Sequence, residues 1–94
     1  MKNRFGDKIK TLREQQRLYL RQVAAHLEID TALLSKIEKG VRNIKKELIP
    51  KLAEVLNADK EELLTLYLAD QLNEIIKDEP LGTKAMNIII NPTN

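Results

Sequence analysis

The sequence predicts an all-α protein of five helices, the fifth of them long, followed by a short C-terminal helix or arm. Apolar residues recur at helical spacing along most of the chain, and no segment shows a clear strand-like alternation. The apolar content of 43% supports a folded core rather than disorder. A length of 94 residues fits one small domain, whose limited core favours a dimer that hides more apolar surface.

Three helices are predicted within the first 40 residues, and they are expected to cover residues 3–16, 20–27 and 31–39. Their apolar residues recur three or four positions apart, as on one helix face: Phe5, Ile9, Leu12, Val23, Ala24, Leu27, Leu34 and Ile37. Asp30 is placed to accept a backbone hydrogen bond as the N-cap of the third helix, and Gly40 is placed to end it. Residues 41–45 follow as a basic loop.

Two more helices are predicted over residues 46–56 and 60–77. Pro50 falls early in the first of these, where backbone amides have no intrahelical acceptor and a proline is tolerated. Asp59 and Glu62 have the spacing of a capping box at the start of the next. Residues 81–90 keep helical spacing but include three consecutive isoleucines, which favour strands, so a short helix, which we prefer, and a strand-like arm both stay open.

Charge is divided unevenly between the two halves of the chain. Residues 1–46 hold 12 Lys and Arg against 5 Asp and Glu, whereas residues 47–94 hold 4 against 9. The net charge of +2 therefore combines one half at +7 with another at −5. This asymmetry favours a polyanion-binding face in the first half and a different role for the second. The alternative is surface charge that is only solvated.

The composition argues against several functional classes. Without Cys there are no disulfides, thiolate chemistry or Cys-based zinc sites, and a reducing cytoplasm is the expected location. One His, His26, cannot build a multi-His metal site. There is no glycine-rich phosphate loop and no His–carboxylate constellation, so we expect no catalytic residue, cofactor, metal or enzymatic activity. No apolar run reaches transmembrane length and no signal peptide is evident, so we expect no membrane partner.

The segment over residues 20–39 has the pattern of a helix-turn-helix, two short helices joined by a three-residue break. Such a motif needs a small residue where its helices cross, and Ala24 meets that need. It also needs apolar residues at the break and on the inner face of the second helix, which Ile29, Leu34 and Ile37 supply.

A longer string, residues 20–40 (LRQVAAHLEIDTALLSKIEKG) with Arg42 and Asn43, resembles the Xre-type, lambda-repressor-like DNA-binding family. The resemblance extends over residues 5–66. It implies a five-helix domain whose third helix enters the major groove, a homodimer on a palindromic operator, and a transcriptional regulator, usually a repressor. The sequence departs from the family pattern at Leu20, in place of a phosphate-binding Gln, at Glu28, in place of a turn Gly, and at Ile44, in place of Pro.

The resemblance and the helical pattern together assign roles to individual residues. Five residues of the third helix are expected to face base edges: Thr31, Ala32, Leu33, Ser35 and Lys36. For Leu33 the alternative is core packing. Seven are expected near phosphates: Arg17, Arg21, Lys39, Arg42, Asn43, Lys45 and Lys46. Arg13 and Glu38 occupy positions that form a structural ion pair in the family.

The fifth predicted helix, over residues 60–77, carries more apolar residues than one small domain can cover. We expect a twofold homodimer through that helix and the tail, using Leu64, Tyr67, Leu68, Leu72, Ile75 and Ile76. The expected division is a DNA-binding domain over residues 1–66 and a dimerisation extension of it over residues 67–94. One alternative is a tail that packs over this face. Another is an antitoxin or adaptor whose acidic half binds a second protein.

Overall fold

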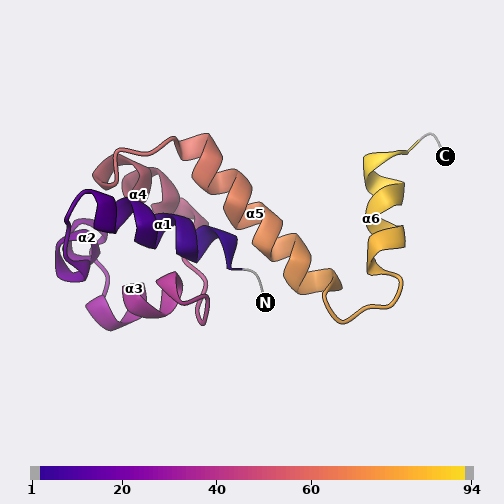
Figure 1. Cartoon of the computed structure of the whole chain (residues 1–94), viewed down its shortest axis with the longest axis horizontal. Helices are drawn as coiled ribbons and strands as arrows, with labels where there is room; N and C mark the ends of the chain where they lie inside the picture. The colour runs from indigo at the N-terminus through magenta and orange to yellow at the C-terminus, as the bar shows by residue number, and fades with distance from the viewer. Residues whose placement is uncertain (1–2, 93–94) are drawn as a thin grey trace.

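The computed structural model describes residues 3–92, and every regular element in this part of the chain is a helix (Figure 1). Its elements are α1 (Arg4–Gln15), α2 (Leu20–Leu27), α3 (Thr31–Glu38), the 3₁₀ turn η1 (Lys46–Leu48), α4 (Ile49–Val55), α5 (Lys60–Ile76) and α6 (Gly82–Ile90). The all-α prediction is therefore confirmed, and the tail over residues 82–90 is a helix rather than a strand-like arm. Residues 1–2 and 93–94 of the predicted domains lie outside the described residues.

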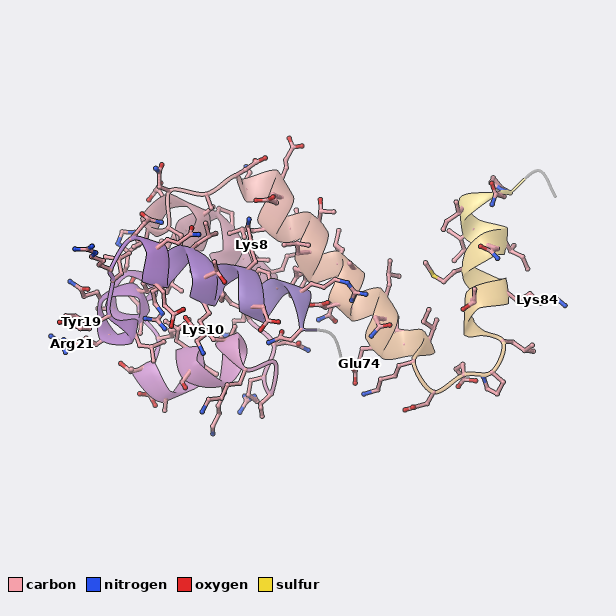
Figure 2. All side chains as sticks on the ribbon, in the orientation of Figure 1. Lys8, Lys10, Tyr19, Arg21, Glu74 and Lys84 are labelled. Atoms are coloured by element: carbon pink, nitrogen blue, oxygen red, sulfur yellow. The ribbon has the colours of Figure 1, made fainter. Side chains whose placement is uncertain are left out.

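The molecule is elongated because α5 leaves the body of the domain. Its principal extents are 47 × 23 × 22 Å. Figure 1 shows α1–α4 gathered at one end, α5 running outward from them, and α6 standing clear at the other end. Lys84 on α6 extends away from α5 (Figure 2). The second half of α5 and all of α6 therefore form a projection rather than part of the core.

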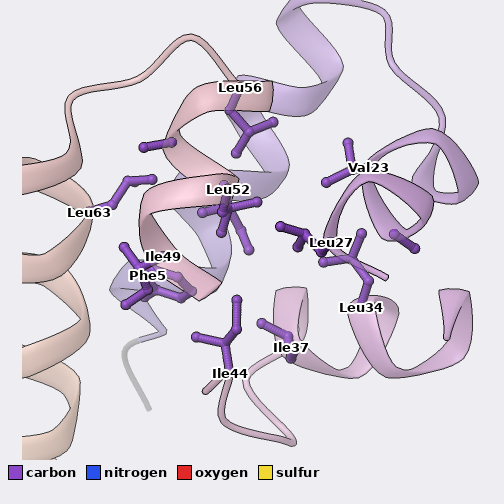
Figure 3. Packing of buried hydrophobic residues seen from close by; sticks show 13 residues of the cluster. Phe5, Val23, Leu27, Leu34, Ile37, Ile44, Ile49, Leu52, Leu56 and Leu63 are labelled. Atoms are coloured by element: carbon purple, nitrogen blue, oxygen red, sulfur yellow. The ribbon is translucent and has the colours of Figure 1, made fainter. Parts of the chain in front are cut away.

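One hydrophobic core is enclosed by α1–α5 (Figure 3). It consists of Phe5, Ile9, Val23, Ala24, Leu27, Leu34, Ile37, Ile44, Ile49, Leu52, Ala53, Leu56 and Leu63. All the inward-facing residues predicted for the first three helices belong to it except Leu12, which is partly buried at its edge. Leu63, in the first turns of α5, is the last buried hydrophobic residue in the described chain, so the core ends where α5 begins to project.

Each of the first four α-helices is followed, within two residues, by a residue with left-handed backbone. These residues are Arg17 (φ 57°), Glu28 (φ 57°), Gly40 (φ 78°) and Asn57 (φ 52°). At the end of α3, Gly40 N donates to Ile37 O (3.1 Å) and Val41 N donates to Lys36 O (2.9 Å), which is a Schellman motif. Glycine adopts this conformation without steric cost, whereas the three other residues adopt it at some cost.

The N-cap residues of α3 and α5 are those predicted, but not all of the predicted capping hydrogen bonds form. Asp30 is the N-cap residue of α3, yet its side chain accepts no capping hydrogen bond. Asp59 does cap α5, because its carboxylate accepts from Glu61 N at 3.1 Å. The other half of the predicted capping box is absent from the hydrogen bonds of α5, and Glu62 instead lies 3.6 Å from Lys8 Nζ of α1. Glu62 therefore pairs with a lysine of another helix instead of capping its own helix.

The fourth predicted helix begins later than expected. Residues 46–48 form the 3₁₀ turn η1, and the α-helix starts at Ile49. Pro50 lies in the first turn of α4, as expected from its missing N–H. The turn shortens the connection from the basic loop and returns the chain to the core at Ile49.

Candidate nucleic-acid interface

The α2–turn–α3 unit is held rigidly by its own backbone and by the core. Ile29 N donates to Ala24 O at 3.0 Å, which closes the turn after α2. Glu28, which stands where the resembled family has a turn glycine, has left-handed backbone there. Ala24 and Leu34 are both fully buried, so the two helices pack closely on their inner faces. The outer face of α3 is therefore presented in one fixed orientation.

That outer face is narrower than the sequence suggested. Thr31, Ala32 and Lys36 are exposed, as predicted. Leu33 is partly buried and packs against the core, which is the alternative considered for it, and Ser35 is partly buried in a groove beside α1. The free face is centred on positions 32 and 36, one helical turn apart.

A run of exposed polar and basic residues continues from the end of α3. Its members are Lys39, Arg42, Asn43, Lys45 and Lys46. The loop that follows Lys39 and carries the other four is held at Gly40 by the Schellman motif and at Ile44, which is only 3% exposed and inserts into the core. We call residues 41–46 the basic loop. Its backbone is anchored although its side chains are free.

Two more exposed arginines lie just before α2 and in its first turn. Arg17 and Arg21 are exposed there, and the Arg21 guanidinium lies over the Tyr19 ring, 4.6 Å from its centroid. Figure 2 shows the side chains of Tyr19 and Arg21 at the same end of the molecule. Tyr19 N donates to Gln22 Oε1 at 2.7 Å, which fixes the first turn of α2. Tyr19 is not among the residues predicted from the sequence, although an aromatic residue two positions before an Arg at a helix start could have indicated it.

Arg13 of α1 and Glu38 of α3 form the ion pair that the resemblance implied. Arg13 Nε lies 2.8 Å from Glu38 Oε2 and Arg13 Nη2 lies 3.1 Å from Oε1, a two-pronged arrangement. Arg13 Nη1 also donates to Leu18 O at 2.9 Å. The hydrogen bond with Glu38 raises the pKa of Arg13 above its ordinary value. Glu38 is 6% exposed and is the one buried charged residue between residues 3 and 92.

The first turn of α1 is held by two side chains, Asp70 and Asn3, neither of which was predicted from the sequence. The carboxylate of Asp70, on α5, accepts hydrogen bonds from Phe5 N (2.9 Å) and Arg4 N (3.4 Å). It also lies 3.0 Å from Arg4 Nη1. Asn3 accepts from Gly6 N at 3.2 Å. The first three amides of α1, which lack intrahelical acceptors, are thus all satisfied.

Only part of the expected dimerisation surface is free. Leu64 and Tyr67 are partly buried against the core, and the Tyr67 ring meets Phe5 edge to face with centroids 5.9 Å apart. Ile76 lies under Gly82, where an added Cβ would approach the Ile76 Cβ to 2.7 Å. The exposed residues are Leu68, Leu72 and Ile75 on α5 and Leu81, Ile88, Ile89 and Ile90 around α6. We call these seven residues the apolar stripe.

Two structural findings bear on other partners. None of the helices between residues 3 and 92 is both long and apolar enough to cross a membrane. Within the same range, no three acidic or histidine side chains gather in a way that could hold a metal ion.

Comparison with known proteins shows the family to which this chain belongs. Residues 4–66 match the family model described as a helix-turn-helix domain. The HTH-type transcriptional repressor RghR of Bacillus subtilis (strain 168) is 36% identical over 72 residues, which cover 76% of this chain and 52% of the repressor. The match thus spans about half the length of that relative. No solved structure matches the chain significantly. Because the family model covers most of the chain, from the start of α1 into α5, the chain belongs to the helix-turn-helix domain family.

Proposed function

We propose that this chain is a transcriptional regulator that binds double-stranded DNA as a homodimer, with α3 in the major groove of a palindromic operator. The observation that carries the proposal is the arrangement of cations around α3. Thr31 and Ala32 are exposed at the start of α3, and the exposed cations of the basic loop follow the end of that helix. Arg17 and Arg21 are exposed around the start of α2, the other helix of the motif. The proposal involves no catalytic step, cofactor or metal, and the site of action is the cytoplasm.

The exposed face of α3 determines how bases would be read. Thr31 and Ala32, at the start of the helix, lie where recognition helices approach base edges. Ala32 offers a methyl contact to thymine, and Lys36 reaches a guanine or a phosphate. Leu33 and Ser35 contribute only their exposed parts. Because this face carries no Arg, Asn or Gln for a bidentate contact, we infer that apolar contacts and DNA shape supply much of the specificity.

Phosphate contacts are expected to supply most of the affinity. Lys39, Arg42, Asn43, Lys45 and Lys46 would engage one strand, and Arg17 and Arg21 the other flank. Leu20 cannot donate a hydrogen bond to a phosphate, but Tyr19 and Arg21 stand on either side of it. Each phosphate neutralised by a cation adds about 0.9 to the salt slope of binding to duplex DNA.

The first test combines Arg42→Ala with Lys45→Ala. Duplexes selected from a random pool give the operator, and affinity is then titrated across salt concentrations. We expect the salt slope to fall by about 3.6, because a homodimer on its operator loses four cations and each phosphate contact adds about 0.9, with weaker binding to every duplex. The control combines Lys51→Ala with Lys60→Ala, which removes the same charge at exposed positions outside α2, α3, the basic loop and the apolar stripe and is expected to leave the slope unchanged. An unaltered slope in the first variant contradicts the proposal.

The homodimer is supported by the apolar stripe. Leu68, Leu72 and Ile75 recur at i, i+4 and i+7 on the projecting part of α5, with Ile75 72% exposed. The nine-residue α6 is shorter than helices that persist alone in water, and its isoleucines face solvent. A second copy would cover both helices around a twofold axis. It would also set two copies of α3 about 34 Å apart, one turn of DNA.

Ile75→Asp is expected to convert the dimer to a monomer, because it places a carboxylate within the stripe while an exposed position tolerates it in the single chain. Sedimentation equilibrium measures the mass, and affinity for the palindrome should fall more than affinity for one half-site. Thr11→Asp, which adds the same charge at an exposed polar position of α1 outside the apolar stripe, should remain dimeric. A monomeric wild-type protein would contradict the dimer and would favour the alternative of a second protein partner on the stripe.

A further inference from the structure

We propose that Asn3 is a positioning residue for DNA binding, one that fixes the junction between α3 and the basic loop and thereby places phosphate contacts it does not itself make. The inference rests on the proposed function. It concerns a residue outside the 4–66 family match and outside both sets of expected DNA contacts.

The Asn3 carboxamide joins the start of α1 to the end of α3. Its Nδ2 donates to Glu38 O at 2.7 Å, and its Oδ1 accepts from Gly6 N at 3.2 Å. Glu38 is the last residue of α3. The first bond therefore holds the backbone carbonyl at the C-terminal end of that helix. A residue that served only as the N-cap of α1 would need the second bond alone.

The space around this carboxamide leaves little room for movement. A Cβ added at Gly40 would lie 2.8 Å from Asn3 Cγ, and a Cβ added at Gly6 would lie 2.5 Å from Glu38 O. The two glycines thus let α1, the Asn3 side chain and the turn after α3 approach one another closely. Real Cβ atoms essentially never come this near to another heavy atom, so both positions require the absence of a side chain.

The basic loop begins at this same turn. Lys36 O, in the last turn of α3, accepts from Val41 N at 2.9 Å and from Arg42 N at 3.3 Å. Arg42 therefore takes its backbone position from the end of α3, which Asn3 holds in place. On the other side of α1, Asp70 binds the amides of Arg4 and Phe5, so the element to which Asn3 anchors α3 is itself fixed to α5.

The test is a double-mutant cycle on the full chain with the selected operator. Asn3→Ser retains a good N-cap for α1 without adding charge, but serine is too short to reach Glu38 O. We expect it to weaken binding about three- to tenfold, the range of one hydrogen bond. If Asn3 acts through the loop, this loss should shrink to less than about twofold when Arg42 is already Ala. Arg17→Ala is the matched background, because it removes a cation of the other flank, and there the full loss should remain.

Binding is measured below the thermal midpoints of all variants, so that global unfolding does not enter the comparison. A merely structural role for Asn3 would lower binding equally in the Arg42→Ala and Arg17→Ala backgrounds, and that result would overturn the inference. Wild-type affinity in Asn3→Ser would overturn it as well. If the wild-type protein binds no duplex, the proposed function fails, and the inference fails with it.

Discussion

Arg13→Ala is expected to lower the free energy of unfolding by about 3–5 kcal/mol, because it leaves a buried carboxylate without its partner. Glu38 is 6% exposed and takes two hydrogen bonds from the Arg13 guanidinium, at 2.8 and 3.1 Å. The same substitution removes the bond from Arg13 to Leu18 O. Since small domains are stable by only about 5–15 kcal/mol, this one change would consume a large part of the total.

Urea denaturation followed by circular dichroism measures this loss. Lys8→Ala is the control, since it removes an exposed pair in which Lys8 Nζ lies 3.6 Å from Glu62, worth about 0–1 kcal/mol. Arg13→Met combined with Glu38→Met should recover much of the stability, because no unpaired charge remains buried. A loss in Arg13→Ala no larger than in Lys8→Ala would show that the buried pair does not hold α1 to α3.

Gly6→Ala is expected to destabilise the fold by about 1–3 kcal/mol, although alanine is the better helix former by about 1 kcal/mol. The new methyl group would lie 2.5 Å from Glu38 O and closer still to Asn3 Nδ2. Because Glu38 O belongs to the backbone of α3, the two helices must separate to make room. Thermal unfolding should therefore begin at a lower temperature in this variant.

The matched control is Thr11→Ala, an exposed position on the same helix, where only helix propensity changes. It should leave stability unchanged or slightly raised, opposite in sign to Gly6→Ala. A Gly6→Ala protein more stable than wild type would mean that α1 and α3 are not in close contact at this point.

The fold was predictable where apolar residues recur regularly. Ile9, Val23, Leu27 and Leu34 are all buried, as their spacing predicted, and the helix-turn-helix lies where its pattern placed it. Side-chain chemistry at helix ends was less predictable. Glu62 has the local spacing of a capping box, but Lys8 of another helix is near enough to compete for it. Local sequence does not contain that competitor.

In the candidate site, too, features set by neighbouring residues in the sequence were predictable, whereas features set by contacts between distant helices were not. Exposure of the basic loop followed from its charges, whereas the partial burial of Leu33, Ser35 and Tyr67 depends on neighbouring helices whose positions no local pattern gives. Asn3 and Glu38 are separated by 35 positions in the chain, and Phe5 and Asp70 by 65. Pairs so far apart leave no periodic signal in one sequence.

The bond between Asp70 and the first turn of α1 has a consequence for the order of folding during synthesis. The amides of Arg4 and Phe5, at the start of α1, obtain their acceptor from a residue 66 and 65 positions later. At about 5–20 residues per second, roughly 3–13 s pass between the synthesis of Phe5 and that of Asp70. The first helix to be made is therefore completed only after nearly the whole domain has been translated. A chain cut where the family match ends, at residue 66, would retain every expected DNA contact and still lack the acceptor that closes its first helix.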